Sequence, residues 1–137
     1  MTLQAPMTEL ESIELARAYV ALSNAHRVEL ILPMFAAEVV YTSSAVGEFS
    51  GTSAIGDMMQ GFFTRYPNVF WLAENFRFIN GRVTFDFGLQ ASAVDSGEQL
   101  QRQGVEHIEF DGHGLIIKLE VQASMGLDSA SNGKPGA

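Results

Sequence analysis

The feature that most constrains the fold of this chain is the Asn80-Gly81 pair, which separates two long runs of alternating apolar residues at 70–79 and 82–94. Asn and Gly tolerate the positive φ angles of a two-residue hairpin turn, so the pair predicts a β-hairpin. In the second run, the apolar residues of one phase are Val83, Phe85, Phe87 and Leu89. One face of that strand should therefore be buried against a core.

A second hairpin is expected further along the chain. Residues 105–110 alternate in polarity, an Asp111-Gly112 turn follows, and an apolar run begins at Leu115. A polar loop at 95–98 separates this hairpin from the first. The second half of the chain therefore predicts an antiparallel meander of four long strands.

The first part of the chain has helical periodicity instead. Thr8 followed by Glu11 is a capping-box signature and predicts a helix over residues 8–24. Pro33 should interrupt the next helix, because proline removes a helical hydrogen bond and clashes with the preceding turn. We expect a kink or two short helices from about residue 26 onward. The apolar residues at helical spacing there are Val28, Ile31, Leu32 and Phe35.

A short strand and a third helix should follow. The β-branched and aromatic run at 39–43 predicts a strand, and the small residues at 44–51 predict a loop. The third helix should end before Pro67, because the residue before a proline is pushed out of helical geometry. Its apolar face would consist of Ile55, Met58, Met59, Phe62 and Phe63.

This order of elements predicts an α+β fold. Three N-terminal helices would pack in a curved, mostly antiparallel sheet that forms a cone-shaped α+β barrel. The chain has 137 residues and no internal break in composition, so we expect a single domain over residues 8–123. The segments 1–7 and 124–137 lie outside the periodic pattern and are expected to be flexible tails.

The charge balance argues against several function classes. The sequence has 16 acidic and 8 basic residues and a net charge of -8, without a basic stripe, so no nucleic-acid partner is expected. No run approaches the roughly 20 apolar residues of a membrane span, and no targeting segment is evident, so we expect no membrane partner and a cytoplasmic location. There is no cysteine, and His26, His107 and His113 lack the spacing of a metal site. Neither a metal nor a cofactor is expected.

One acidic residue falls among core positions. Glu106 shares a strand phase with Ile108 and Phe110, so its carboxyl should point into the interior. Burial would raise the pKa of this carboxyl and allow it to act as an acid, whereas the alternative is a carboxylate satisfied by a neighbouring hydroxyl or arginine. His107 should lie on the opposite sheet face. The sequence does not decide which sheet face Trp71 occupies. The residues of its strand whose alternation fits the inner face are Phe70, Leu72, Phe76 and Phe78.

Four short motifs occur in a characteristic order. They are Tyr19-Val20-Ala21, Met34-Phe35-Ala36 leading to Val39-Val40-Tyr41, Gly51-Thr52-Ser53-Ala54-Ile55, and Glu106-His107-Ile108-Glu109-Phe110-Asp111-Gly112. With the order of helices and strands, they resemble the nuclear transport factor 2-like superfamily, which includes ketosteroid isomerases and SnoaL-like polyketide cyclases. The resemblance covers residues 8–123. It implies a cone-shaped pocket between the sheet and the helices, and a homodimer built on the outer sheet face.

Similarity to ketosteroid isomerases also implies roles for single residues. Tyr19 matches a helix tyrosine and Glu106 matches a strand acid, and these two groups would together form an oxyanion hole, with a direct hydrogen bond between them as its signature. The position of the general-base aspartate matches Ser43, and a hydroxyl cannot replace a carboxylate as proton carrier without an activating partner. Met59 matches a further pocket tyrosine. Whether the chain is an enzyme therefore stays open at this point.

A second activity of the superfamily needs an Asp-Arg-Asp set inside the cone, as in limonene epoxide hydrolases. Arg102 is available on a strand, but Asp86 alternates outward between Phe85 and Phe87. The sequence therefore favours the isomerase-like or cyclase-like alternative over the epoxide hydrolase.

We expect a small apolar molecule to bind in this pocket, with Tyr19 and Glu106 as candidate catalytic residues. The chemistry would be proton transfer of the isomerase or cyclase type on a carbonyl compound. The other expected lining residues are Phe35, Tyr41, Ser43, Met59, Phe62, Phe85, Phe87, Ile108 and Leu119. The alternative is a non-catalytic homodimeric scaffold of the same fold that binds a ligand or a partner.

Overall fold

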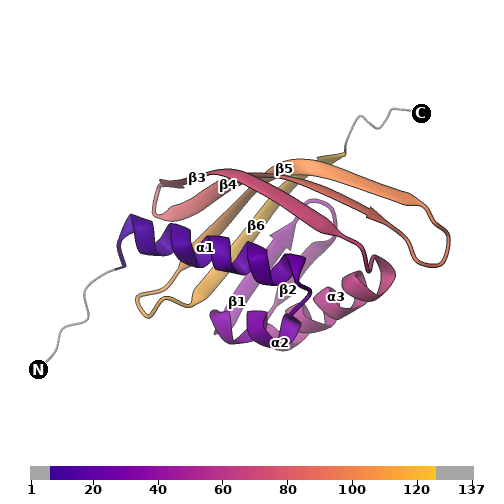
Figure 1. The fold of residues 1–137 in the computed structure, drawn as a ribbon. Helices are drawn as coiled ribbons and strands as arrows, with labels where there is room; N and C mark the ends of the chain where they lie inside the picture. The colour runs from indigo at the N-terminus through magenta and orange to yellow at the C-terminus, as the bar shows by residue number, and fades with distance from the viewer. Residues whose placement is uncertain (1–6, 126–137) are drawn as a thin grey trace, which may run out of the picture.

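The structure is a computed structural model that describes residues 7–125 (Figure 1). Helix α1 (Glu9–Asn24) begins at the capping box that the sequence predicts. The Thr8 hydroxyl accepts a hydrogen bond from the Glu11 amide at 3.0 Å, and the Glu11 carboxylate accepts one from the Thr8 amide at 2.9 Å. Two amides that a helix start leaves unpaired are thereby satisfied. Most of both expected tails lies outside the described residues.

The second helix is short. Helix α2 (Val28–Ile31) passes into a 3₁₀ turn, η1 (Leu32–Met34), so the two short helices expected around Pro33 are confirmed. Phe35, which was expected on this helix, instead begins strand β1 (Phe35–Ser43). That prediction was wrong because the helical spacing continued past a proline that ends helical pairing. Phe35 still reaches the core from the strand and is only 5% exposed.

The segment after β1 contains a strand that the sequence did not reveal. Strand β2 (Gly47–Ser50) pairs antiparallel with β1, and Tyr41 lies opposite Phe49. Gly47 has a φ of 107°, a conformation that favours glycine. The prediction of a loop over residues 44–51 was wrong because this strand has no alternation of its own and is defined by its backbone pairing with β1.

Helix α3 (Thr52–Arg65) buries Ile55 and Met59 and ends before Pro67, as predicted. Helix α1 packs against β3 and β4, and α3 packs against β1 and β2, so the helices lie on the inner side of the curled sheet (Figure 1). None of the helices within residues 7–125 is long and apolar enough to cross a membrane.

Six strands form one curled sheet in the order β2-β1-β6-β5-β4-β3. The predicted meander consists of β3 (Phe70–Ile79), β4 (Arg82–Ser92), β5 (Gln99–Phe110) and β6 (Ile116–Met125). Strand β1 pairs parallel with β6, with Tyr41 opposite Leu119, whereas the other neighbours are antiparallel. The edge strands β2 and β3 do not pair with each other. The α+β class is therefore confirmed, with an unclosed sheet in place of a closed barrel.

Two details of the meander were not expected from the sequence. Strand β6 continues to Met125, two residues beyond the expected boundary of the domain at 123. Strands β5 and β6 approach each other closely at Gly104, where a Cβ atom would lie 2.1 Å from the backbone oxygen of Gln122. Because backbone atoms cannot give way as a flexible side chain does, only glycine permits this approach.

A bulge interrupts β3. The register between β3 and β4 shifts between Glu74 and Arg77, and Asn75 within this interval has a φ of 60°. The Asn75 side chain donates a hydrogen bond to the Asp86 carboxylate at 3.0 Å, and this contact holds the bulge against β4. One extra residue in a strand moves all later side chains to the other face.

The bulge decides which aromatic residues of β3 face the interior. Before it, Trp71 points inward, while Phe70 and Leu72 are 56% and 65% exposed on the outer face. After it, Phe76 points inward and stacks on Phe85, with ring centroids 4.7 Å apart. The open question of Trp71 is thereby settled, and the inner facing expected for Phe70 and Leu72 was wrong because a period-2 pattern cannot reveal a bulge.

The core lies between the inner sheet face and the helices. The predicted inner phase of β4 is confirmed, since Val83, Phe85, Phe87 and Leu89 are all buried. The largest fully buried side chains are Phe85, Ile31, Ile55, Ile108, Ile116, Leu119, Val39 and Val83.

Candidate functional site

A cavity of about 70 Å³ lies between the inner sheet face and helices α1 and α3. Its wall is mainly apolar, with a few polar side chains among the aromatic and aliphatic ones, which is the usual make-up of a small-molecule site. The lining residues are Tyr19, Val20, Ser23, Tyr41, Ser43, Ala45, Val46, Met58, Met59, Phe62, Phe63, Trp71, Phe85, Phe87, Leu89, Arg102, Glu106, Val121 and Ala123.

Most of the residues expected in the pocket come together at this cavity. Those that line it are Tyr19, Tyr41, Ser43, Met59, Phe62, Phe85, Phe87 and Glu106. Phe35, Ile108 and Leu119 are buried in the core but do not line the cavity. Ile108 and Leu119 lie on the inner side of their strands, as the alternation indicated, and Phe35 reaches the core from β1.

Glu106 lies at the centre of the inner sheet face. On β5 it is flanked by Phe85 of β4 and Val121 of β6, and it is only 6% exposed. Burial raises the pKa of the Glu106 carboxyl to about 8, because the ionised form loses its hydration. None of the ion pairs among residues 7–125 includes it. At neutral pH the group is therefore mostly a protonated acid, which can donate a hydrogen bond into the cavity.

Two tyrosines share the cavity with Glu106. Burial raises the pKa of the Tyr19 phenol well above its usual value, and the charge of nearby Glu106 raises it further. The pKa of the Tyr41 phenol is raised by the same two causes, and Arg102 partly opposes them. Tyr19 and Glu106 are thus close enough to interact electrostatically, without the direct hydrogen bond that the resemblance implied. Both phenols remain neutral donors at physiological pH.

The two serines that line the cavity form hydrogen bonds to nearby backbone groups. The Ser43 hydroxyl accepts hydrogen bonds from the amides of Ala45 and Val46 at 3.1 and 3.3 Å, so it stabilises the turn between β1 and β2. The Ser23 hydroxyl donates to the carbonyl oxygen of Tyr19 at 2.9 Å within α1. Neither serine has a basic partner that would make it a proton acceptor.

Arg102 is a cavity residue that sequence reasoning considered only for an epoxide hydrolase. It lies on β5 opposite Leu89, and its Nε atom is buried without a hydrogen-bond partner. Strand alternation could have predicted its position, because Arg102 and Glu106 are four residues apart on one strand and therefore lie on the same sheet face. Trp71, Met58 and Phe63 also line the cavity without having been expected there.

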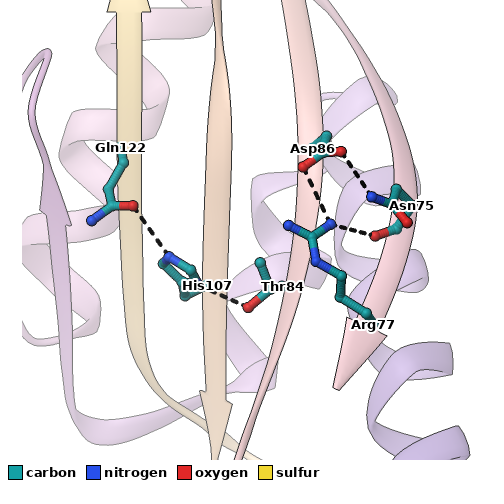
Figure 2. A network of polar contacts seen from close by, with 6 residues as sticks. All are labelled: Asn75, Arg77, Thr84, Asp86, His107 and Gln122. Atoms are coloured by element: carbon teal, nitrogen blue, oxygen red, sulfur yellow. Dashed lines mark hydrogen bonds and ion pairs between the residues drawn. The ribbon is translucent and has the colours of Figure 1, made fainter. Parts of the chain in front are cut away.

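A group of polar side chains from β3, β4, β5 and β6 forms contacts on the outer sheet face (Figure 2). His107 contacts the Thr84 hydroxyl through Nδ1 at 2.8 Å and the Gln122 side-chain oxygen through Nε2 at 3.3 Å. Asp86 pairs with Arg77 at 3.2 Å. His107 therefore lies on the face opposite Glu106, as predicted, and Asp86 supplies no second carboxylate to the cavity.

The other two histidines are not among the residues that line the cavity. His26 stacks on Phe63 with centroids 4.3 Å apart, and its Nε2 is 3.2 Å from the Val69 carbonyl oxygen. His113 is exposed in the turn after β5. Within residues 7–125, no cluster of three or more histidine, aspartate or glutamate side chains could hold a metal ion.

Comparison with known proteins agrees with this architecture. A family model described as a SnoaL-like domain matches residues 16–119. A proposed isomerase from Bacillus subtilis superimposes with a TM-score of 0.75 at 15% identity, covering 86% of this chain and 90% of that chain. No protein with a curated description matches the sequence significantly.

Two further solved structures have the same fold. AclR, a proposed hydroxylase from Streptomyces galilaeus, has a TM-score of 0.72 at 16% identity and covers 88% of this chain and 92% of its own. The epoxide hydrolase/cyclase-like enzyme SalBIII, which acts in pyran ring formation in the polyether salinomycin, has a TM-score of 0.73 at 14% identity, with coverages of 85% and 92%. Identities this low establish a shared fold alone. The family match over residues 16–119 and the helix-lined, curled sheet together show that the chain belongs to the SnoaL-like family of the nuclear transport factor 2-like superfamily.

Proposed function

We propose that this protein binds a small, mainly apolar carbonyl compound in the cavity and promotes proton transfer α to the carbonyl, as in isomerisation, cyclisation or dehydration. The observation that carries this proposal is the buried Glu106 carboxyl, whose pKa of about 8 keeps it protonated at neutral pH. A neutral acid in an apolar wall is suited to donate a hydrogen bond to an oxygen that becomes negative.

In this mechanism the carbonyl oxygen of the ligand accepts a hydrogen bond from the Glu106 carboxyl. A base from the solvent takes up the α-proton, the carbonyl becomes an enolate, and the negative charge gathers on the same oxygen. Tyr19, which is neutral and buried beside Glu106, supplies a second donor. Both interactions strengthen as charge develops, so they favour the transition state over the bound ketone.

The groups that line the cavity can polarise the carbonyl of the ligand, but none of those described is a base for the α-proton. Ser43 occupies the position where ketosteroid isomerases have their base, and its hydroxyl is engaged by two backbone amides. Among the described lining residues, Glu106 is the one carboxyl. Binding and oxyanion stabilisation are therefore the roles that we assign to this site.

The test is the rate of hydrogen–deuterium exchange at the α-carbon of an uncharged ketone such as β-tetralone, followed by NMR. We expect the wild-type protein to accelerate exchange and Glu106→Leu, which has a similar size but no hydrogen-bond donor, to lower that acceleration roughly 10²- to 10³-fold, the usual cost of one oxyanion donor. Glu109→Leu serves as the matched control, because Glu109 lies on the same strand in the opposite phase. Equal rates for wild type and Glu106→Leu would remove the catalytic role of Glu106.

A second candidate is a non-catalytic homodimeric scaffold that binds a ligand or a partner. Two observations favour it: the serine at the base position, and the exposed Phe70 and Leu72 side chains on the outer sheet face. Light scattering tests the dimer, because a particle of 14.9 kDa would be a monomer and would exclude it. A ligand that copurifies with the protein but undergoes no exchange would favour binding without catalysis.

A further inference from the structure

Arg102 is the one basic side chain that lines the cavity among the described residues, and oxyanion chemistry leaves it without a role. Its Nε atom is buried and has no hydrogen-bond partner. Three ion pairs occur within residues 7–125: Arg27–Glu29, Arg77–Asp86 and Arg82–Glu120. Arg102 belongs to none of them. A buried guanidinium nitrogen without a protein acceptor is costly, so Arg102 is suited to bind an acceptor that a ligand brings into the cavity.

The position of Arg102 relative to Glu106 defines two polar ends of one cavity. The two residues share the inner phase of β5, four positions apart, which separates their Cα atoms by roughly 13 Å. Burial alone raises the pKa of Glu106, so the guanidinium does not neutralise that carboxyl. The charges of both groups act on the Tyr41 phenol, because Glu106 raises its pKa and Arg102 lowers it.

The wall between these two ends is apolar. Phe87 and Leu89 of β4 line it from the sheet, with Leu89 directly opposite Arg102. Trp71 lies beside Leu89 on β3, and Phe62 packs on Trp71 with ring centroids 6.0 Å apart. A ligand that reaches both ends must therefore present an apolar body between two oxygen-bearing groups.

We propose that Arg102 binds a carboxylate of the ligand, so that the substrate is an apolar keto acid with its carbonyl at Glu106 and its carboxylate at Arg102. An arginine guanidinium is suited to this task because its planar set of donors matches the two oxygens of a carboxylate. An uncharged ketone would leave the buried guanidinium nitrogen without an acceptor. The assignment of the carbonyl end rests on the proposed function, whereas the carboxylate end rests on Arg102 alone.

Three related probes separate the two ends: 4-acetylbenzoate, whose ring lies between the ketone and the carboxylate, its methyl ester, and 4-ethylbenzoate, which lacks the ketone. Binding to wild type is measured by calorimetry or by NMR titration. We expect the acid to bind about ten- to hundredfold more tightly than the ester, as for a hydrogen bond to a charged group. In Arg102→Gln this ratio should fall to about one. Glu106→Leu, which has no hydrogen-bond donor, should keep the ratio between acid and ester and lose the preference for 4-acetylbenzoate over 4-ethylbenzoate.

Arg82→Gln is the matched control, because Arg82 carries the same charge but pairs with Glu120 away from the cavity lining. It should retain the full preference for the acid. In wild type, the NMR signal of the Arg102 Nε–H group should shift on addition of the acid and not of the ester, so the test stands even where Arg102→Gln folds poorly.

Each outcome separates the two proposals. Equal binding of acid and ester by wild type, or a preference that survives in Arg102→Gln, overturns the carboxylate site and leaves the proposed function intact. A preference for the acid without any preference for the ketone overturns the carbonyl chemistry and leaves the carboxylate site intact. Failure of all three probes to bind overturns both.

Discussion

Replacing Glu106 by glutamine should change the way in which stability depends on pH. The Glu106 carboxyl has a pKa of about 8 in the folded protein, against an ordinary value of 4.5. Between these two values the native state holds a proton that the unfolded chain has released, so the free energy of unfolding falls as pH rises. The contribution is fully present below pH 4.5 and is lost as pH rises through about 8.

The magnitude follows from the interval between the two pKa values. At about 1.36 kcal/mol per pH unit, the whole interval from 4.5 to about 8 amounts to roughly 5 kcal/mol. From pH 5.5 to 7.5 the expected loss is about 2.7 kcal/mol. These figures are upper limits, because water entering the cavity would solvate the carboxylate and lower its pKa.

Glu106→Gln keeps the shape of the protonated side chain and removes its titration. The two proteins should have similar stability near pH 5, and the variant should become the more stable one as pH rises. Urea unfolding at a series of pH values measures this, with the fluorescence of the single tryptophan, Trp71, as the signal. Subtracting one curve from the other cancels the other titrating groups, and Glu109→Gln controls for the loss of a carboxyl on the outer face. Parallel curves for wild type and Glu106→Gln would refute the buried, protonated acid.

Two further substitutions test the frame around the cavity. Gly104→Ala should lower the free energy of unfolding by more than about 2 kcal/mol, because its Cβ would lie 2.1 Å from the Gln122 backbone oxygen. Gly88→Ala is the control: its Cβ would meet nothing within 4 Å, so the free energy of unfolding should change by less than about 1 kcal/mol. Comparable losses in thermal unfolding for the two variants would contradict the close approach of β5 and β6. Asn24→Ala removes an amide that accepts from the Trp71 amide at 2.7 Å and donates to its carbonyl at 2.9 Å, so it should cost roughly 1–3 kcal/mol and shift the tryptophan emission. An unchanged spectrum and stability would show that these two bonds do not hold β3 in place.

The elements that could be predicted from sequence are those whose signal is local. The capping box at Thr8 and the alternation of β4 each depend on residues a few positions apart, and both are confirmed. The errors arose where a distant partner decides the structure. Strand β2 exists because β1 pairs with it, and the side chains of β3 change face at a bulge held by Asn75 and Asp86. Neither the strand β2 nor the bulge in β3 has a local sequence pattern that would predict it.

The same distinction applies to the candidate site. The inward position of Glu106 follows from the alternation of one strand, and Arg102 obeys the same rule. Whether an inward residue touches open space depends instead on how closely the helices cover it. Ile108 and Leu119 are therefore core residues outside the cavity lining, although their strand phases match those of Glu106 and Val121. Strand periodicity predicts which sheet face a residue occupies, but whether that residue lines the cavity depends on tertiary packing.

The parallel pairing of β1 with β6 also sets the order in which the fold can be completed. Strand β1 lies near the start of the chain and β6 lies at the end of the described residues, yet Tyr41 and Leu119 are partners. During synthesis the first helices and β1 emerge early and can pair only with β2, while the neighbour on the other side of β1 is still missing. Contacts between such distant residues form slowly, because a long loop must close first. The inner wall of the cavity is thus one of the last parts of the protein to form, and a nascent chain that stops before β6 leaves its apolar residues exposed.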